Sequence, residues 1–483
     1  MLSIRQKQLL GVLITALFIR LISLHFYPLM DTTEARYGEM ARLMVETGNW
    51  LTPLFDYGVP FWGKPPLQNW MSAGSIALFT NNEFFLRLPH FIAGLFTLIA
   101  VALFAKQFAI SRLNVALVLS TICVFYVCLG TVMTDMGLLF AVTLAYIGFY
   151  LAFTKHKSFA YIGFIGLGIG LLAKGPVALV IFFIGSGLWL LWHFGAVKMW
   201  SQLVIKVPLI SGFALMLLLA APWYWMAEQA TPGFLEYFLI GEHYSRFVDS
   251  GWQGDLYGSA HDQPRGKIWL FFAFAGLPWT LFIPAALYKL YQRHNGFDGL
   301  TKFLICWMLS PLILFTLAGN ILPAYVLPAA PALALLVAYA WKEHGVAHLA
   351  KVAAFIPVLL LVALAMVNSG IDKQKSDKWL LSQRSEDHRV FYWLQQEFSG
   401  RYYTQGQAKL IDQNTLQEVT QSQFYLVAHH KHIDVSLPPF SRCIQQANTQ
   451  DKSLLLCRSS ASTSASELKA QSDDLAVEQL SRH

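Results

Sequence analysis

Long apolar stretches separated by short polar breaks fill the chain from about Leu9 to Met366. Because a helix needs about 20 mostly apolar residues to cross a bilayer, this pattern predicts an α-helical polytopic membrane protein with about 11–13 spans. The first stretch is followed by no small-residue cleavage site, so we expect it to be retained as a helix. The expected spans are 9–29, 70–105 (one long segment or two broken ones), 113–131, 136–154, 159–173, 176–196, 203–223, 267–289, 302–318, 322–341 and 351–368.

The pattern changes after Val367, where charged residues become frequent. In this polar part, apolar runs predict short strands at Phe424 to Val427 and at Leu454 to Cys457, and a helix at Val390 to Phe398. These elements indicate a small soluble α/β domain, followed by a Ser/Ala-rich tail that we expect to be flexible. The predicted transmembrane domain, soluble domain and tail cover residues 1–368, 369–458 and 459–483.

Composition supports the membrane assignment, because 55% of the residues are hydrophobic, 13% are charged and the mean hydropathy is +0.47. A net charge of +7 would suggest nucleic acid as the partner of a soluble protein. Here the basic residues fall in short loops at alternate membrane ends, which indicates topology. We therefore predict a cytoplasmic N-terminus, an exported C-terminal domain and no nucleic-acid partner. The loop cations are Arg5, Lys7, Lys106, Arg112, Lys155, Lys157, Lys198, Lys289, Arg293, Lys342 and Lys351.

The cysteines divide between the two predicted environments. Cys123, Cys128 and Cys306 lie in spans, where they are expected to pack as small apolar residues. Cys443 and Cys457 lie in the exported domain, where oxidation is permitted, and whether they pair is left open.

The first outward loop, 30–69, contains an amphipathic segment. From Asp31 to Asn49, one apolar stripe at helical spacing predicts a juxtamembrane helix that lies in the interface plane and ends at Gly48. Asp31 and Glu34 have the spacing of a capping box, and a carboxylate at this place also suits a general base. The stripe consists of Tyr37, Met40, Ala41, Met44 and Val45.

The same loop continues as FDYGVPFWGKPPL, with Lys64 among aromatic residues and prolines. A lysine at a membrane interface usually extends its ammonium to water. Pro65 and Pro66 restrict the backbone here, so Lys64 is held more rigidly than an ordinary loop lysine. A held cation next to the membrane suits a lipid phosphate.

The loop sequences TTEARYGEMARLMVETGNW and GVPFWGKPPLQNW resemble the first periplasmic loop of the aminoarabinose lipid A transferase family. That family is part of the protein O-mannosyltransferase superfamily of C-type glycosyltransferases. Further similar segments follow in the same order over most of the membrane domain. They are TVMTDM with Asp135, LLAKGPVALV with Lys174, GFLEYFLIGEHYSRF from Gly233 to Phe247, LPW from Leu277 to Trp279, and LPAYVLP from Leu322 to Pro328.

The resemblance places the family's acidic motif D-E-x-R-Y on Thr33 to Tyr37. Its aspartate is a threonine in this chain, and Asp31 lies two residues upstream. Either Asp31 or Glu34 is therefore the expected base. Members of the aminoarabinose group often have glutamate before the lysine, where it helps to hold a metal. Gly63 stands there in this chain, so we do not predict a metal site or a cofactor, and dependence on a divalent metal is left open.

The expected reaction takes a sugar from a polyprenyl (undecaprenyl) phosphate carrier. The departing phosphate is a good leaving group, so the site needs a base, cations that gather negative charge and a wall against water. Asp135 is the expected second carboxylate, although it also suits a helix cap. The expected carrier- and sugar-binding residues are Arg36, Tyr37, Lys64, Lys174, Arg246 and Tyr325. His243 and His261 are either proton carriers or solvated loop histidines.

By the resemblance, the acceptor is lipid A or another lipopolysaccharide on the periplasmic face of a bacterial inner membrane. A protein O-glycosyltransferase, with a Ser or Thr acceptor, is the alternative enzyme. A secondary transporter is a distant alternative, because the charges cluster at membrane ends while transport sites lie near the midplane. A non-catalytic scaffold leaves the gathering of acidic and basic residues on one face unexplained. The residues do not specify the sugar.

Overall fold

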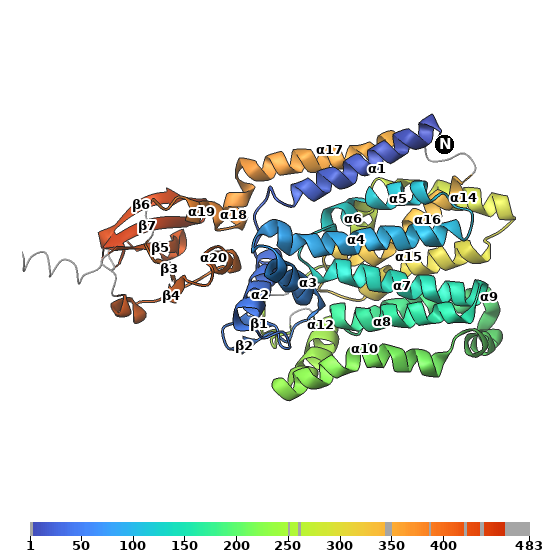
Figure 1. Cartoon of the computed structure of the whole chain (residues 1–483), viewed down its shortest axis with the longest axis horizontal. Coiled ribbons are helices and arrows are strands. Elements are labelled where there is room, and N and C mark those ends of the chain that lie inside the picture. The colour runs from blue at the N-terminus through green and yellow to red at the C-terminus, as the bar shows by residue number, and fades with distance from the viewer. Residues whose placement is uncertain are drawn as a thin grey trace, which may run out of the picture. The chain divides into compact units, whose positions relative to one another are not determined.

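The computed structural model describes residues 3–249, 252–258, 262–342, 350–385, 388–419, 423–434 and 439–458. Contacts group them into two compact units (Figure 1). The membrane unit contains the chain up to Phe26 and Met40–Leu364. The C-terminal unit contains the chain from Ala365 onward together with Tyr27–Glu39, the segment that follows α1.

The membrane unit is built from helices, with one short hairpin, β1 (Leu54–Asp56) and β2 (Val59–Pro60). Helix α2 (Thr33–Thr47) begins in the C-terminal unit and continues into this one. The other elements are α1 (Ile4–Ser23), α3 (Leu67–Leu78), α4 (Glu83–Lys106), α5 (Arg112–Ser120), α6 (Cys123–Cys128), α7 (Thr134–Thr154), η1 (Lys157–Phe159), α8 (Ala160–Lys174), α9 (Val177–Lys206), α10 (Leu209–Ala230), α11 (Phe234–Glu236), η2 (Tyr237–Ser245), α12 (Arg246–Val248), α13 (Ile268–Ala275), η3 (Trp279–Phe282), α14 (Ile283–His294), α15 (Gly299–Thr316), η4 (Pro323–Ala329), α16 (Ala330–Ala340) and α17 (Ala350–Met366).

The predicted polytopic helical architecture is confirmed, and each expected apolar stretch is helical. Within the described residues, eight helices are long and apolar enough to cross a membrane, and a bent pair, α13 with η3 and α14, makes a ninth. The remaining expected stretches are interrupted or short. Of the two forms expected for 70–105, the broken one is observed, as α3 and α4.

The expected span 113–131 is broken between α5 and α6, and the break has a partner. The Cys123 N–H donates to the Leu277 carbonyl at 2.9 Å, in the break between α13 and η3. The Trp279 indole N–H donates to the Thr121 hydroxyl at 3.0 Å. A backbone N–H at the first helix break is thus bonded to a backbone carbonyl at the second. Backbone groups at membrane depth need such partners, because no water is present there.

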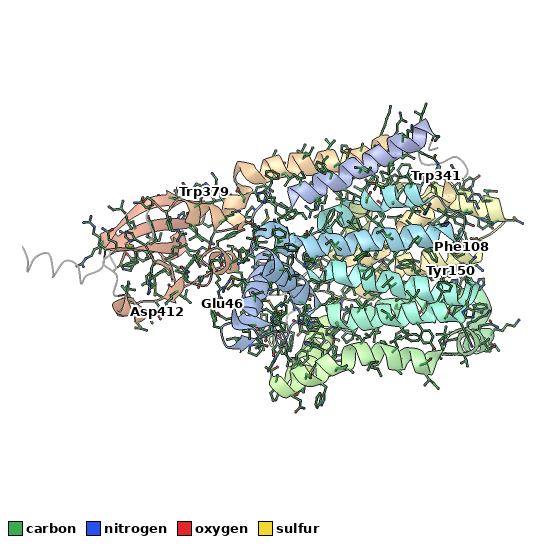
Figure 2. All side chains as sticks on the ribbon, in the orientation of Figure 1. Glu46, Phe108, Tyr150, Trp341, Trp379 and Asp412 are labelled. Atoms are coloured by element: carbon green, nitrogen blue, oxygen red, sulfur yellow. A yellow bond between two sulfur atoms is a disulfide. The ribbon has the colours of Figure 1, made fainter. Side chains whose placement is uncertain are left out.

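Aromatic rings fill the bundle between α7, α9 and α15. Tyr150 stacks on Phe303 at 4.2 Å between ring centroids, and Tyr146 stacks on Trp307 at 4.7 Å. Phe108 joins this cluster, with its ring centroid 5.6 Å from that of Tyr150, and Figure 2 shows both at one end of the bundle. Offset aromatic packing of this kind adds to the stability of the bundle beyond area burial.

Glycines bring α7 and α8 close together. A Cβ added at Gly148 would lie 2.3 Å from the Gly163 backbone nitrogen, and one at Gly166 would lie 2.6 Å from the Ala141 carbonyl oxygen. Small residues permit such backbone approach in membrane bundles. This packing fixes the end of α7 that carries Asp135 against the end of α8 that carries Lys174.

We expect Gly148→Ala to destabilise the membrane unit by about 1–3 kcal/mol, because the new methyl group meets backbone and no side chain can yield. Gly187→Ala is the matched control, since a Cβ there meets nothing within 4 Å. Thermal unfolding of both variants in detergent measures the difference. Equal melting temperatures would contradict this packing.

The helix predicted after Asp31 is present as α2, with Gly48 at a φ of 69° just after its end. Four residues of the expected apolar stripe, Tyr37, Met40, Ala41 and Met44, are buried. Val45 is exposed, and the polar residues Glu39 and Arg42 are buried. The helix is therefore covered on more of its circumference than a simple amphipathic pattern predicts.

The C-terminal unit contains a five-stranded sheet with the order β4-β3-β5-β7-β6. Strand β3 lies between β4 and β5 and is parallel to both, and the other pairs are antiparallel. Its elements are α18 (Asp372–Lys375), α19 (Lys378–Ser382), β3 (Val390–Trp393), α20 (Phe398–Tyr403), β4 (Lys409–Ile411), η7 (Thr415–Glu418), β5 (Gln423–His429), η8 (His430–His432), η9 (Phe440–Arg442), β6 (Cys443–Asn448) and β7 (Lys452–Arg458).

The predicted small α/β domain and its strands at 424–427 and 454–457 are confirmed, within β5 and β7. The predicted helix from Val390 to Phe398 is wrong, because Val390–Trp393 is strand β3 and a helix begins only at Phe398. All four residues of β3 are buried, and its alternate side chains enter two different cores. Aromatic and β-branched residues suit such a strand. Cys443 and Cys457 form a disulfide between β6 and β7.

Candidate functional site

A cavity of about 340 Å³ lies in the membrane unit, where α8 ends and α9 begins. Its wall combines three cations, one carboxylate and an imidazole with apolar side chains from α9, α15 and η4. A mixed lining of this kind suits a charged head group attached to an apolar chain. The lining residues are Lys64, Lys174, Pro176, Val177, Val180, Glu242, His243, Arg246, Phe247, Leu314, Phe315, Ala318, Asn320 and Tyr325.

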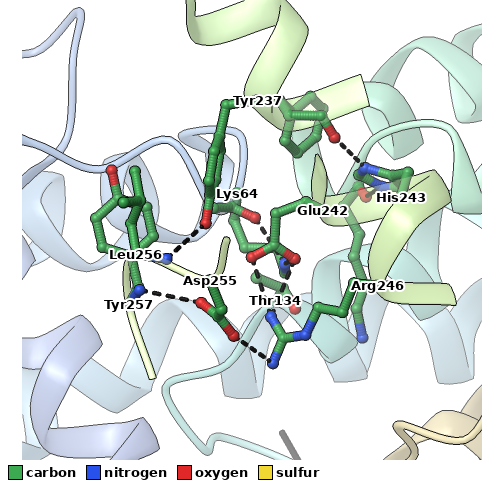
Figure 3. Close-up of polar contacts among 12 residues, drawn as sticks. Lys64, Thr134, Tyr237, Glu242, His243, Arg246, Asp255, Leu256 and Tyr257 are labelled. Carbon is green, nitrogen blue, oxygen red and sulfur yellow. Dashed lines mark hydrogen bonds and ion pairs between the residues drawn. The ribbon is translucent and has the colours of Figure 1, made fainter. Parts of the chain in front are cut away.

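Lys64 reaches the cavity from the turn between β2 and α3, where Pro65 and Pro66 lead into the helix. Its ammonium donates to the Gly63 carbonyl at 2.6 Å and to a Glu242 carboxylate oxygen at 3.1 Å (Figure 3). The side chain is 19% exposed, so most of it is held by protein contacts. Lys64 is thus held by the Gly63 carbonyl and the Glu242 carboxylate.

Glu242 is the central carboxylate of this cluster, on the π-helical turn η2. Arg246, four residues later, donates to its two carboxylate oxygens at 3.0 and 3.1 Å and forms an ion pair with Asp255 at 3.3 Å. Burial acts to raise the pKa of Glu242, but Lys64 and Arg246 outweigh it, and the pKa lies below its ordinary value. Glu242 is therefore ionised at neutral pH.

Aromatic residues fix the loop that carries Asp255. The Tyr257 hydroxyl donates to the Pro60 carbonyl at 2.9 Å and accepts from the Trp62 N–H at 3.1 Å. The Leu256 N–H donates to the Tyr237 hydroxyl at 3.1 Å (Figure 3). The Tyr257 bonds tie the segment that carries Asp255 to the chain just before Lys64, and the Leu256 bond ties it to η2, which precedes Arg246.

A second ion pair joins α7 and α8. The Lys174 ammonium donates to an Asp135 carboxylate oxygen at 2.8 Å, with both side chains less than 10% exposed. The same ammonium lies 4.3 Å from the centroid of the Tyr325 ring, and this ring packs on Phe315 at 4.8 Å. Asp135 thus orients a cavity lysine.

His243 lies between two backbone carbonyls, with Nδ1 2.7 Å from the Phe238 oxygen and Nε2 3.3 Å from the Lys174 oxygen. Burial, followed by the charge of Lys64, lowers the pKa of this imidazole, so it is neutral at pH 7. His243 is not a solvated loop histidine, because it ties η2 to the end of α8. His261 lies outside the described residues.

The acidic segment of the first loop belongs to the C-terminal unit. The Asp31 carboxylate accepts hydrogen bonds from the Ser399 N–H, at 3.0 Å, and from the Ser399 hydroxyl. The Asp31 carboxylate is therefore bonded to a distant residue, whereas in a capping box it would accept a hydrogen bond from the first turn of α2. Burial raises the pKa of Asp31 to about 7, with Ser399 opposing and Asp377 adding to the rise. Glu34 is buried.

Arg36 and Tyr37 follow in the same unit, and the Arg36 guanidinium lies 5.3 Å from the centroid of the Tyr37 ring. Of the residues predicted for the site, the cavity therefore brings together Lys64, Lys174, His243, Arg246 and Tyr325.

Sequence reasoning missed Glu242 and Asp255. Glu242 lies within the quoted segment GEHYSRF, and its spacing of four residues from Arg246 is the available signal. A Cβ at Gly63 would lie 3.3 Å from a Glu242 oxygen, so this carboxylate lies beside the residue that precedes Lys64. Among the residues that the structure describes, no group of three or more His, Cys, Asp or Glu has the arrangement of a metal site.

A family model described as dolichyl-phosphate-mannose-protein mannosyltransferase matches residues 9–238. An undecaprenyl phosphate-alpha-4-amino-4-deoxy-L-arabinose arabinosyl transferase of Enterobacter sp. (strain 638) is 30% identical over 333 residues, which are 66% of this chain and 56% of that protein. The enzyme of the same name from Yersinia pestis is 28% identical over 385 residues, 74% of this chain and 66% of that protein.

The fold also has a solved counterpart. The crystal structure of ArnT from Cupriavidus metallidurans bound to undecaprenyl phosphate has a TM-score of 0.76 and 16% identity, and the match covers 92% of this chain and 97% of that one.

The fold and the site together define a polytopic membrane protein with a cation-lined cavity at one end of its helix bundle. The chain is similar to the aminoarabinose lipid A transferases and, over residues 9–238, to the protein O-mannosyltransferase family. This confirms the resemblance seen in the sequence.

Proposed function

We propose that this protein is a membrane glycosyltransferase that moves a sugar from a polyprenyl phosphate carrier to lipid A or a related lipopolysaccharide. The observation that carries the proposal is the cavity in which Lys64, Lys174 and Arg246 lie beside apolar residues of α9 and α15. A phosphate suits the cations, and an isoprenoid chain suits the apolar part.

The cations have a chemical role in this reaction. When the glycosidic C–O bond breaks, the phosphate oxygen keeps the electron pair, and the negative charge that develops is stabilised by Lys64, Lys174 and Arg246. The acceptor hydroxyl gives its proton to a base, for which Asp31 and Glu34 are the candidates. An Asp31 pKa raised to about 7 suits a base that works near neutral pH.

We also propose that the cavity opens to the periplasm and that the C-terminal unit is periplasmic, with a cytoplasmic N-terminus. The basic short loops favour this orientation. The disulfide between Cys443 and Cys457 adds independent support, because disulfides persist in the bacterial periplasm and are rare in the cytosol.

The names of the relatives suggest which substrates to try first. The relatives from Enterobacter and Yersinia are named for undecaprenyl phosphate-linked aminoarabinose, and the family model is named for mannosyl transfer to protein. Lipid A with carrier-linked aminoarabinose is therefore the first pair, and a protein acceptor is the second.

The test is sugar transfer by the purified protein from carrier-linked sugars to lipid A, read as a mass shift. We expect the wild type to give a shift and Lys64→Ala to lose it, while the exposed Lys157→Ala keeps it. Comparison of Asp31→Asn with Glu34→Gln identifies the base. Transfer to protein alone would replace the lipid acceptor, and no transfer to either would refute the proposal.

A further inference from the structure

The cations of the cavity are matched by carboxylates in the described structure. Lys64 pairs with Glu242, Arg246 pairs with Glu242 and Asp255, and Lys174 pairs with Asp135. The six side chains therefore sum to a formal charge near zero. A phosphate that enters this cavity meets a neutralised site and not a free cationic one.

Glu242 differs from the other two carboxylates because it lies in the cavity wall itself. Its oxygens lie 3.0 to 3.1 Å from nitrogen atoms of both Lys64 and Arg246, which is the distance that a bound phosphate oxygen would have. Its side chain is 5% exposed. Figure 3 shows the carboxylate between the two cations. Glu242 thus makes the contacts that a phosphate in this cavity would make.

The charge of the phosphate changes during the reaction. In the sugar-linked carrier it is a diester with one negative charge, and after transfer it is a monoester with a charge of about −1.5 to −2 at pH 7. Three cations without a competing carboxylate would hold this spent carrier more tightly than the donor. A nearby fixed carboxylate repels the more highly charged monoester more strongly.

We propose that Glu242 is an internal competitor for the carrier phosphate, which sets the preference of the site for the sugar-linked donor over the spent carrier. It occupies Lys64 and Arg246 when the site is empty, and it favours release of the monoester after transfer. This inference rests on the proposed function. It makes Glu242 a specificity-determining residue that acts through Lys64 and Arg246.

The test is Glu242→Gln, which keeps the shape and removes the charge. We expect polyprenyl monophosphate to bind at least about tenfold more tightly, with a smaller gain for the sugar-linked donor. Because release then becomes slow, kcat and KM should fall together. Glu236→Gln is the matched control, since Glu236 is an exposed carboxylate at the start of the same turn. Both variants are compared with the wild type in thermal unfolding.

Unchanged or weaker binding of the monophosphate by Glu242→Gln would overturn the inference. Glu242→Ala provides a second variant if glutamine impairs folding, and the same gain is expected. If the wild type binds no polyprenyl phosphate, the proposed function fails. In that case the binding of inorganic phosphate tests the role of Glu242 separately. We expect inorganic phosphate to bind Glu242→Gln more tightly than the wild type.

Discussion

Arg246→Ala is expected to lower sugar transfer by at least about 100-fold, because it removes a donor that stabilises the phosphate charge in the transition state. The loss has a second cause, since Glu242 then keeps only Lys64 to neutralise it and repels the phosphate. Arg246→Lys should recover little, because one ammonium cannot reproduce the planar fork, in which Nη1 bonds Glu242 and Nη2 pairs with Asp255. Initial rates with a carrier-linked sugar measure the effect.

Arg265→Ala serves as the control, because Arg265 is an exposed arginine in the same connection between α10 and α13. It should retain most of the activity. The double variant Arg246→Ala with Glu242→Gln should be more active than Arg246→Ala alone, since the repulsion is gone. Full activity of Arg246→Ala would show that the cavity is not the phosphate site.

Asp135→Ala is expected to cost about 3–5 kcal/mol of stability as well as activity, because it leaves the buried ammonium of Lys174 without its carboxylate. Thermal unfolding in detergent should show a clear fall in the melting temperature. Lys174→Met should have a similar effect for the opposite reason, since it leaves the Asp135 carboxylate buried without its lysine.

Removing both charges separates stability from function. The double variant Asp135→Asn with Lys174→Met should regain much of the melting temperature, because no buried charge remains without a counterion. It should stay inactive, since one of the three cavity cations is missing. If the double variant is as unstable as the single variants, the stability loss does not come from leaving one charge of the Asp135–Lys174 ion pair without its partner.

The cavity cations were predictable because each has a local signal. Lys64 is fixed by two prolines, Lys174 precedes a Gly-Pro turn, and Arg246 lies in a loop segment shared with the family. Spans of alternating direction then place these ends together. The sequence does not show that Asp255 pairs with Arg246, because the loop bonds of Tyr237 and Tyr257 bring these two residues together.

Two misjudged features depended on long-range contacts. The run from Val390 was expected to be helical. Pairing with β4 on one side and β5 on the other makes it a strand despite its local sequence pattern, and these partners begin 19 and 33 residues later, at Lys409 and Gln423. Asp31 looked like a helix cap, yet its carboxylate bonds to Ser399, 368 residues further along the chain. No local rule anticipates such a partner.

The bond between Asp31 and Ser399 also joins two parts of the chain that are synthesised at different times. At about 5–20 residues per second, a ribosome needs roughly 20–70 s to reach Ser399 after Asp31 has been made. During that time the helix bundle can insert, but the acidic segment lacks the residues that hold it. A nascent chain that ends before α20 therefore already carries Lys64, Lys174 and Arg246, while the Asp31 carboxylate still lacks the Ser399 groups that bond it.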